Sequence, residues 1–242
     1  MRTLVIELQK EKRTGVIPLM LAVGILGAAY AFMYFSIRKD TLLNLPLAPM
    51  DVLLTQSYGM IIILNMFGII ATACMIYNME FRGNAVKKMY MLPMSVPTMY
   101  FCKFLILTVM LLLAVGFQNM VLAIIGIAYL PQGTVEASTL IAFSGYAFIV
   151  SMPVLAFMIF VSSRFEHMWI PLGIGVAGFL SGMALIVLED MTWSCVHPFV
   201  LMLKPAVAMS VEPDMTVVIA SLAETIFFLC MGLLTAKNLR YE

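Results

Sequence analysis

Six long runs of apolar residues alternate along the chain with short clusters of polar and charged residues. Each run is close to the roughly 20 residues that an α-helix needs to cross the hydrocarbon core of a bilayer. The runs cover approximately residues 16–37, 52–78, 100–129, 138–161, 169–188 and 215–236. This pattern predicts an all-α membrane protein with six transmembrane helices. Because no repeat or linker interrupts it, one domain is expected over residues 1–242.

Two further segments are apolar in part but too short to span a bilayer. The N-terminal MRTLVIELQKEKRTG places six charged residues before the first long run, which is unlike a cleavable signal peptide. With Leu4, Val5 and Leu8 on one face, it predicts an amphipathic helix at the membrane interface. The second segment, FVLMLKPAVAM, lies in the long connection 189–214 and predicts a re-entrant or interfacial hairpin on the outer face before the last span.

The composition indicates that lipid, rather than water, is the solvent for most of this chain. Hydrophobic residues make up 63% of it and charged residues 11%, whereas a soluble domain carries about 25% charged residues. The net charge of +1 says little, because the placement of Lys and Arg matters more than their sum in a membrane protein.

The basic residues are distributed unequally between the two ends of the predicted spans. One side receives eleven of them: Arg2, Lys10, Lys12, Arg13, Arg82, Lys87, Lys88, Lys103, Arg164, Lys237 and Arg240. The other side receives three, Arg38, Lys39 and Lys204. Since loops rich in Lys and Arg stay in the cytoplasm, both termini are predicted to be cytoplasmic.

Motifs of catalytic and metal-binding chemistry are missing from the sequence. No Gly-rich phosphate-binding loop, HExxH or CxxC pattern occurs, and His167 and His197 are predicted on opposite sides of the membrane. The sequences around Ser144 and Ser181 lack the first glycine of GxSxG. The four cysteines have no metal-like spacing and are interpreted as apolar filler. No catalytic residue, metal site or cofactor in this chain is expected, and an intramembrane enzyme is disfavoured.

Four polar residues lie inside predicted spans: Asn65, Gln118, Asn119 and Glu224. An ionisable group at this depth is costly and normally faces protein or water rather than lipid. Together they are a candidate intramembrane polar pathway, with Glu224 contacting substrate or acting in a conformational switch. The alternative is structural, with Glu224 protonated or hydrogen-bonded to the amide of Gln118 or Asn119.

The segment MEFRGNAVKKMYMLPMSVP, residues 79–97, concentrates charge on the predicted cytoplasmic side between the second and third spans. Its apolar positions recur at helical spacing: Phe81, Ala85, Met89 and Leu92. Its polar positions follow the same period: Glu80, Asn84, Lys87 and Lys88. Proline lacks the next backbone donor, so Pro93 ends the pattern. A short amphipathic helix along the inner membrane surface is predicted.

This segment resembles the first cytoplasmic loop of ABC-type-2 transporter permeases. The resemblance rests on Glu80, Gly83-Asn84, Lys87-Lys88, Leu92-Pro93, Ser95 and Lys103. Six spans, a basic N-terminal elbow helix and a long, partly apolar connection before the last span are also similar to that family, so the resemblance covers the whole chain. The size and the stretch IELQKEKRTG look like the small permeases of lantibiotic and bacitracin immunity exporters.

The resemblance implies that residues 79–97 contain a coupling helix that docks on a separate ATP-binding-cassette subunit. The contact would be made by Glu80, Arg82, Asn84, Lys87 and Lys88, with a smaller contribution from Arg164 and Glu166 in the second cytoplasmic connection. ATP and Mg would bind to the dimer of partner subunits. The permease would pair with a second permease, identical or related, in a bacterial plasma membrane.

The expected function is that of an exporter permease that removes lantibiotic-type peptide antibiotics or other amphipathic compounds from the membrane. A permease for multidrug or lipid-like cargo is the alternative within transport. A different class is a non-transporting membrane scaffold or sensor subunit, whose charged loop binds a cytosolic protein. No nucleic-acid partner is expected.

Overall fold

The structure is a computed structural model that describes residues 2–12, 14–43, 49–81, 96–131, 136–186, 196–208 and 211–238. Within these ranges the regular structure is helical and no strand occurs. The helices are α1 (Arg2–Glu11), α2 (Val16–Leu43), α3 (Pro49–Phe81), α5 (Val96–Tyr129), α6 (Ala137–Ser162), α7 (Trp169–Ile186), α8 (Pro198–Ala208) and α9 (Met215–Asn238).

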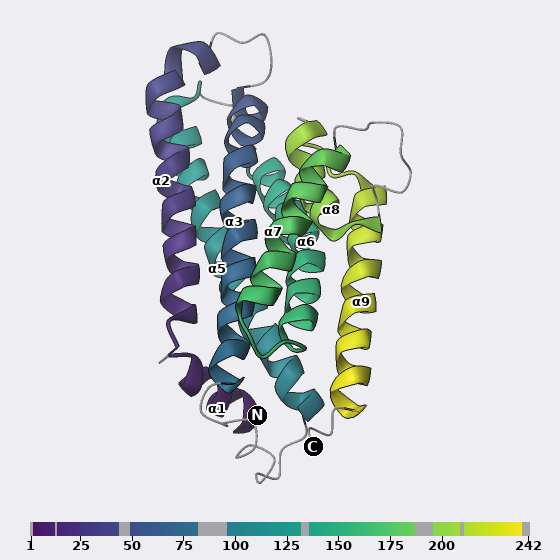
Figure 1. Cartoon of the computed structure of the whole chain (residues 1–242). Helices are drawn as coiled ribbons and strands as arrows, with labels where there is room; N and C mark the ends of the chain where they lie inside the picture. Colours follow the sequence, from purple (N-terminus) through teal and green to yellow (C-terminus); the bar gives the residue numbers. More distant parts are fainter. Residues whose placement is uncertain are drawn as a thin grey trace.

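The long helices form one bundle. Six of them, α2, α3, α5, α6, α7 and α9, are long and apolar enough to cross a membrane, which confirms the predicted all-α class with six spans. Helix α1 lies at the end of the bundle where α2 begins and α9 ends, whereas α8 lies toward the opposite end (Figure 1).

Several helices extend beyond the apolar runs that predicted them. The second span was expected at 52–78, but α3 covers Pro49–Phe81. The third was expected to begin at residue 100, but α5 begins at Val96. Helix α2 continues to Leu43, past a departure from helical geometry at Arg38 (φ −109°, ψ 15°). Hydropathy identifies only the part of a helix that lies in the hydrocarbon core. The helix can continue into the interface, because its backbone hydrogen bonds are satisfied within the helix.

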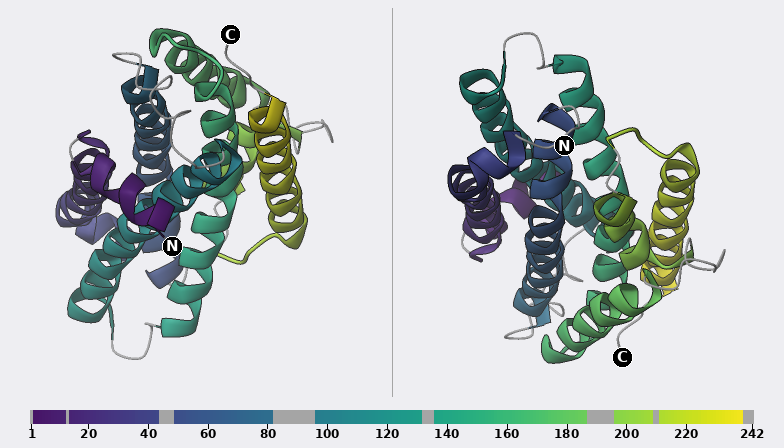
Figure 2. Two further views of the ribbon diagram at one scale, coloured as in Figure 1. Left: turned by 90° about the horizontal axis from the view of Figure 1, so that it is seen from below. Right: turned by 90° about the horizontal axis from the view of Figure 1, so that it is seen from above.

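The best-buried helices are α3 and α6. In their most apolar stretch 61% of the residues are buried, compared with 17% in α7 and 22% in α9. Views along the bundle from its two ends place α2, α7 and α9 at the periphery (Figure 2). The peripheral helices therefore present most of their apolar side chains outward.

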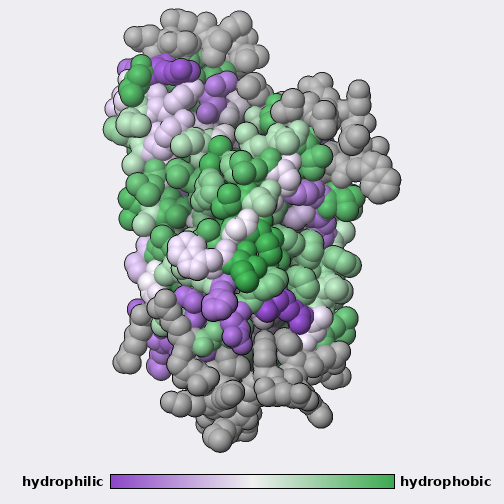
Figure 3. Space-filling model, in the orientation of Figure 1, coloured by the Kyte–Doolittle hydropathy of each residue, from purple (hydrophilic) through white to green (hydrophobic). Residues whose placement is uncertain are grey.

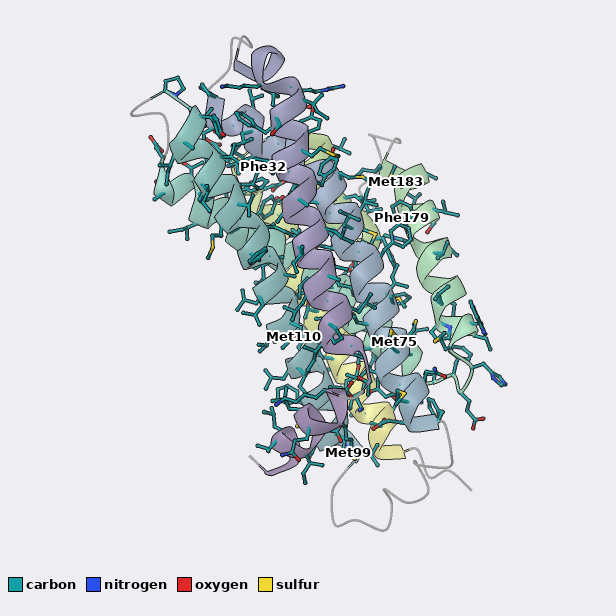
Figure 4. All side chains as sticks on the ribbon, turned by 90° about the vertical axis from the view of Figure 1, so that its left-hand side faces the viewer. Phe32, Met75, Met99, Met110, Phe179 and Met183 are labelled. Atoms are coloured by element: carbon teal, nitrogen blue, oxygen red, sulfur yellow. The ribbon has the colours of Figure 1, made fainter. Side chains whose placement is uncertain are left out.

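The face of the bundle shown in Figure 3 is mainly apolar at mid-height and more hydrophilic toward both ends. The exposed side chains of Phe32 on α2 and Met183 on α7 lie toward one end of the bundle (Figure 4). The buried Met99, at the base of α5, lies toward the other end. Phe32 is 51% exposed. Apolar surface of this extent is typical of a protein that contacts lipid, so the chain is a multi-pass membrane protein.

The apolar segment before the last span, for which a re-entrant or interfacial hairpin was predicted, forms the single helix α8. Its residues Phe199, Val200, Leu201, Met202 and Leu203 are buried, and α8 packs against α3, α6 and α7. The helix is therefore inserted into the bundle rather than laid on its surface. Glycines on α7 make room for it, because a Cβ atom at Gly182 would lie 2.9 Å from the Cβ of Phe199.

Candidate functional site

A buried lysine binds acidic residues from two other helices at the α1 end of the bundle. Lys103 of α5 is 1% exposed. Its Nζ lies 2.8 Å from Oε2 of Glu7 and 3.9 Å from Oε1 of Glu11, both on α1, and 2.9 Å from Oε1 of Glu80 on α3. We call Glu7, Glu11, Glu80 and Lys103 the Lys103 charge cluster. It fastens α1 to the adjacent ends of α3 and α5.

Helix α1 presents its glutamates inward and its β-branched residues outward. Glu7 and Glu11 are buried, while Val5 and Ile6 are 51% and 41% exposed. The sequence placed Leu4, Val5 and Leu8 on one apolar face at the membrane interface, and that face stays a prediction; in the structure Leu4 and Leu8 are half-buried and Val5 is exposed. The orientation follows from charge, because a buried ammonium group requires carboxylates.

A glycine and a threonine connect α1 to the first span. Gly15 adopts a φ of 80°, a left-handed conformation that glycine reaches without steric cost, between the end of α1 and the start of α2 at Val16. The Thr14 hydroxyl donates to Oε2 of Glu11 at 2.7 Å. Glu11 is thereby held next to Lys103 by a second partner.

The two glutamates of α1 respond differently to their surroundings. Burial alone would raise the pKa of Glu7, but Lys103 and Lys10 outweigh it, so that pKa lies below its usual value. Lys10 Nζ is 2.7 Å from Oε1 of Glu7. Burial raises the pKa of Glu11, and its more distant contact with Lys103 offsets this only partly. Glu7 is thus the principal counter-ion that α1 offers to Lys103.

The Lys103 charge cluster frames the segment that was predicted to be a coupling helix. Helix α3 ends at Phe81, one residue after Glu80, and α5 begins at Val96, seven residues before Lys103. Arg82, Asn84, Lys87 and Lys88 lie outside the described residues, so their predicted contact remains a prediction. Glu80, predicted to face the partner subunit, points an oxygen at Lys103 and is 14% exposed.

The second predicted docking connection lies beside the end of α3. A cavity of about 330 Å³ is lined by Asn78, Phe81, Glu166, His167, Met168 and Trp169. Asn78 Nδ2 lies 3.5 Å from Sδ of Met168. Arg164 is partly buried and stacks its guanidinium over Phe160, 5.4 Å from the ring centroid. The structure therefore brings Glu166 next to the end of α3 at Phe81, while Arg164 turns back onto Phe160 of α6.

Two of the four intramembrane polar residues pair with each other. Asn65 Nδ2 donates to Oε1 of Gln118 at 2.9 Å, and Gln118 Nε2 donates to Oδ1 of Asn65 at 2.8 Å. Both side chains are buried. Gly27 of α2 allows this arrangement, because a Cβ atom there would collide with the Gln118 amide. The pair ties α3 to α5 at the position where α2 crosses them.

The other two do not join this pair. Asn119 Nδ2 donates to the carbonyl of Val115 in its own helix, at 2.8 Å. Neither carboxyl oxygen of Glu224 has a hydrogen-bond partner in the part of the chain that the structure describes, although both are buried. Of the alternatives for Glu224, a hydrogen bond to Gln118 or Asn119 is not formed among the described residues, where Gln118 pairs with Asn65 and Asn119 with its own backbone. A role of Glu224 in a polar pathway stays a prediction.

Sequence reasoning did not identify the Lys103 charge cluster. Lys103 was counted among the cytoplasmic basic residues and among the residues of the family resemblance, and Glu7 and Glu11 were not singled out. A signal was present, because Glu7 and Glu11 are spaced i, i+4 and therefore share one helix face. Their common partner is 96 residues away from Glu7, and no local pattern reveals a contact of that separation. Across the described ranges, no group of three or more His, Cys, Asp or Glu side chains is arranged to hold a metal ion.

Six spans, an inserted short helix and a charge cluster at the base of two spans define a polytopic membrane protein of the permease type. A family model described as "ABC-2 family transporter protein" matches residues 3–182, most of the chain, so the chain belongs to that family. It is a membrane subunit of an ATP-binding-cassette transporter and not catalytic by itself, and its family implies an ATP-binding-cassette partner. No curated protein matches the sequence.

Proposed function

We propose that this chain is the permease of an exporter that removes lantibiotic-type peptide antibiotics or other amphipathic compounds from a bacterial plasma membrane. It would work with a dimer of ATP-binding subunits, which hold ATP and Mg, and with a second permease, identical or related. Both termini and the Lys103 charge cluster would face the cytoplasm. The observation that carries the proposal is this cluster, which ties three helices together around segment 82–95.

The cluster supports a specific route for mechanical work. Glu80 lies just before segment 82–95, and Lys103 lies on the helix that follows it. Lys103 binds Glu80 and is tied to α1 through Glu7. A push on the segment by the closing ATP-binding subunits would therefore move the bases of α3 and α5 together with α1. Glu166 and the end of α3 line one cavity, and this surface would offer a second contact for the ATP-binding subunits.

Reversal of charge in the segment tests the proposed docking. We expect Lys87→Glu together with Lys88→Glu to abolish permease-stimulated ATP hydrolysis, because the charges that meet the partner subunit are inverted. The measurement is the ATPase rate of the co-purified complex in lipid nanodiscs. Lys39→Glu, an exposed change near the opposite end of α2, is the matched control and should retain stimulation. Unchanged stimulation in the double variant would contradict docking through this segment.

The cargo needs a separate assay. Cells that carry the intact transporter should tolerate a higher concentration of a lantibiotic than cells with the Lys87/Lys88 double variant. If ATP hydrolysis is coupled but lantibiotic tolerance is equal, the multidrug or lipid-like cargo is the better assignment. If the purified chain binds a cytosolic protein that hydrolyses no ATP, the scaffold or sensor alternative replaces transport.

A further inference from the structure

Glu224 is an ionisable residue near the middle of the last membrane span, the apolar stretch Met215–Ala236 of α9. The residue is half-buried, and both of its carboxyl oxygens are buried without a hydrogen-bond partner among the described residues. None of the ion pairs within those residues includes it. A carboxylate ion would be strongly destabilising here, because neither a cation nor water would offset its lost hydration.

Two contacts fix the register between α9 and α6, the helix beside it. Val217 of α9 packs in one buried cluster with Tyr146 of α6. Further along, the ring of Phe228 lies edge-on to the ring of Phe157, with centroids 5.2 Å apart. The same offset along the chain separates the members of both pairs, so the two helices run parallel and stay in step over this stretch.

In this register Glu224 faces Pro153 of α6. Positions 146, 150, 153 and 157 share one face of α6, and positions 217, 221, 224 and 228 share one face of α9. Proline has no backbone N–H, so Pro153 leaves the carbonyl of Ile149 without its usual helical donor. One turn from Glu224, Ser221 is fully buried, and its Oγ has no hydrogen-bond partner among the described residues. Polar atoms without partners therefore gather at one level of the α6–α9 interface.

No other titratable group in the described chain acts on Glu224. Helices α5, α6 and α8 pack against α9, and their titratable side chains are Tyr100, Cys102, Lys103, Tyr129, Tyr146 and Lys204. Of these, Tyr146 interacts with Asp214, just before α9 begins, and Tyr100 meets Gly232, two turns beyond Glu224. None of them influences the ionisation of Glu224, on which burial alone acts. The charge of Glu224 is therefore set by how closely α9 packs on the bundle.

We propose that Glu224 is a proton-binding site that latches α9 against α6. The neutral carboxyl places no charge in the span, and its O–H group is a donor on the face where Pro153 leaves a carbonyl without one. A proton is also the one ligand that needs no added space between the helices. When the O–H bond breaks, the proton passes to water and the electron pair stays on the carboxylate. That ion requires water, so α9 must move away from α6 to admit it.

Infrared spectroscopy of the purified protein in phospholipid vesicles tests the site, because neutral and ionised carboxyl groups absorb at different frequencies. The spectra are recorded at about pH 6, where an exposed glutamate is ionised. We expect the wild-type spectrum minus that of Glu224→Gln to contain the C=O band of a neutral carboxyl. Glu166→Gln is the matched control: Glu166 is exposed, so its difference spectrum should contain carboxylate bands. Carboxylate bands in the Glu224 difference spectrum would overturn the proposal.

Thermal unfolding at several pH values tests the latch. Over the range from about pH 6 to 9 the folded state holds a proton that the unfolded state has released, so stability falls as the pH rises. We expect the unfolding temperature of the wild type to fall relative to Glu224→Gln by about 3–5 °C for each pH unit over which the proton is held. Glu166→Gln should follow the wild type at every pH. A gap between wild type and Glu224→Gln that does not change with pH, or that changes in the opposite direction, would contradict the latch.

A second variant keeps both tests valid if Glu224→Gln does not fold. Glu224→Asp retains a carboxyl group at the same position, so its C=O band should appear at a shifted frequency and its stability should still fall as the pH rises. If the band keeps its frequency, it arises from another residue and Glu224 does not hold the proton. The inference does not depend on the proposed transport function, because neither measurement involves ATP, cargo or a partner subunit.

Discussion

At the scale of single residues, Lys103 determines how the base of the bundle is assembled. Its ammonium group lies among Glu7, Glu80 and, at longer range, Glu11, with the ring of Tyr77 5.6 Å from Nζ. A buried ion pair adds little over an apolar replacement of both partners, but loss of one partner strands the other charge. Lys103 therefore stabilises the protein mainly by keeping the nearby carboxylates from being buried without a positive partner.

Replacement of this lysine should be strongly destabilising. We expect Lys103→Met to cost about 3–5 kcal/mol, because Glu80 loses the cation beside it and the buried Glu7 keeps only the partly exposed Lys10. For a chain of this size that corresponds to a fall of roughly 6–20 °C in unfolding temperature. Thermal unfolding in detergent, followed by tryptophan fluorescence, measures it.

Lys10 provides the control for this prediction. It also contacts Glu7, but its side chain is 37% exposed, and exposed pairs contribute less than about 1 kcal/mol. Lys10→Met should therefore change the unfolding temperature little. If Lys103→Met and Lys10→Met lowered the unfolding temperature equally, contact with Glu7 rather than burial would explain the contribution of Lys103 to stability.

Polar residues in spans are easy to find in a sequence, but their partners are not. Asn65 and Gln118 were both identified as intramembrane polar groups, yet their pairing depends on how α3 and α5 rotate about their own axes. Glu224 shows the limit, because its depth left a pathway role and an amide partner both open, and the described structure shows no hydrogen-bond partner for it. The depth of a polar residue in the membrane can be predicted from hydropathy, whereas its hydrogen-bond partner is determined by how the helices pack.

At the scale of whole elements, α8 and α7 are fitted to each other by small residues. Gly178 and Gly182 leave a groove on α7 in which Phe199 lies, as small residues do between membrane helices. The short apolar segment that forms α8 was recognised from the sequence. The sequence did not show that this segment fits against α7, because nothing local specifies which face of α7 meets Phe199.

A single added methyl group should disturb this fit. We expect Gly178→Ala to destabilise the protein by about 1–3 kcal/mol, the usual cost of overpacking, because its Cβ atom collides with the Phe199 ring. Gly173→Ala is the matched control on the same helix, since its Cβ atom meets nothing within 4 Å. The unfolding temperature of Gly178→Ala should be clearly lower than that of Gly173→Ala. If both behave alike, the α7–α8 contact does not have the tightness seen in the structure.

At the scale of the whole molecule, the six spans place the described connections at two opposite ends. Helix α6 runs from Ala137 to Ser162 without interruption at Pro153. Ser138 lies at its start and His167 lies in the turn that follows its end, so these two exposed residues lie at opposite ends of the bundle. Charge asymmetry predicts that the His167 end, which includes the Lys103 charge cluster, is cytoplasmic. The fold alone is equally compatible with either orientation.

Cysteine labelling decides the orientation. In a variant without Cys74, Cys102, Cys195 and Cys230, Ser138→Cys should react with a membrane-impermeant maleimide in intact cells, whereas His167→Cys should react only after permeabilisation. Both positions are exposed, so access to the reagent depends on the side of the membrane rather than on burial. The reverse pattern would place the Lys103 charge cluster outside, where no ATP-binding subunit could reach segment 82–95, and coupling through it would fail.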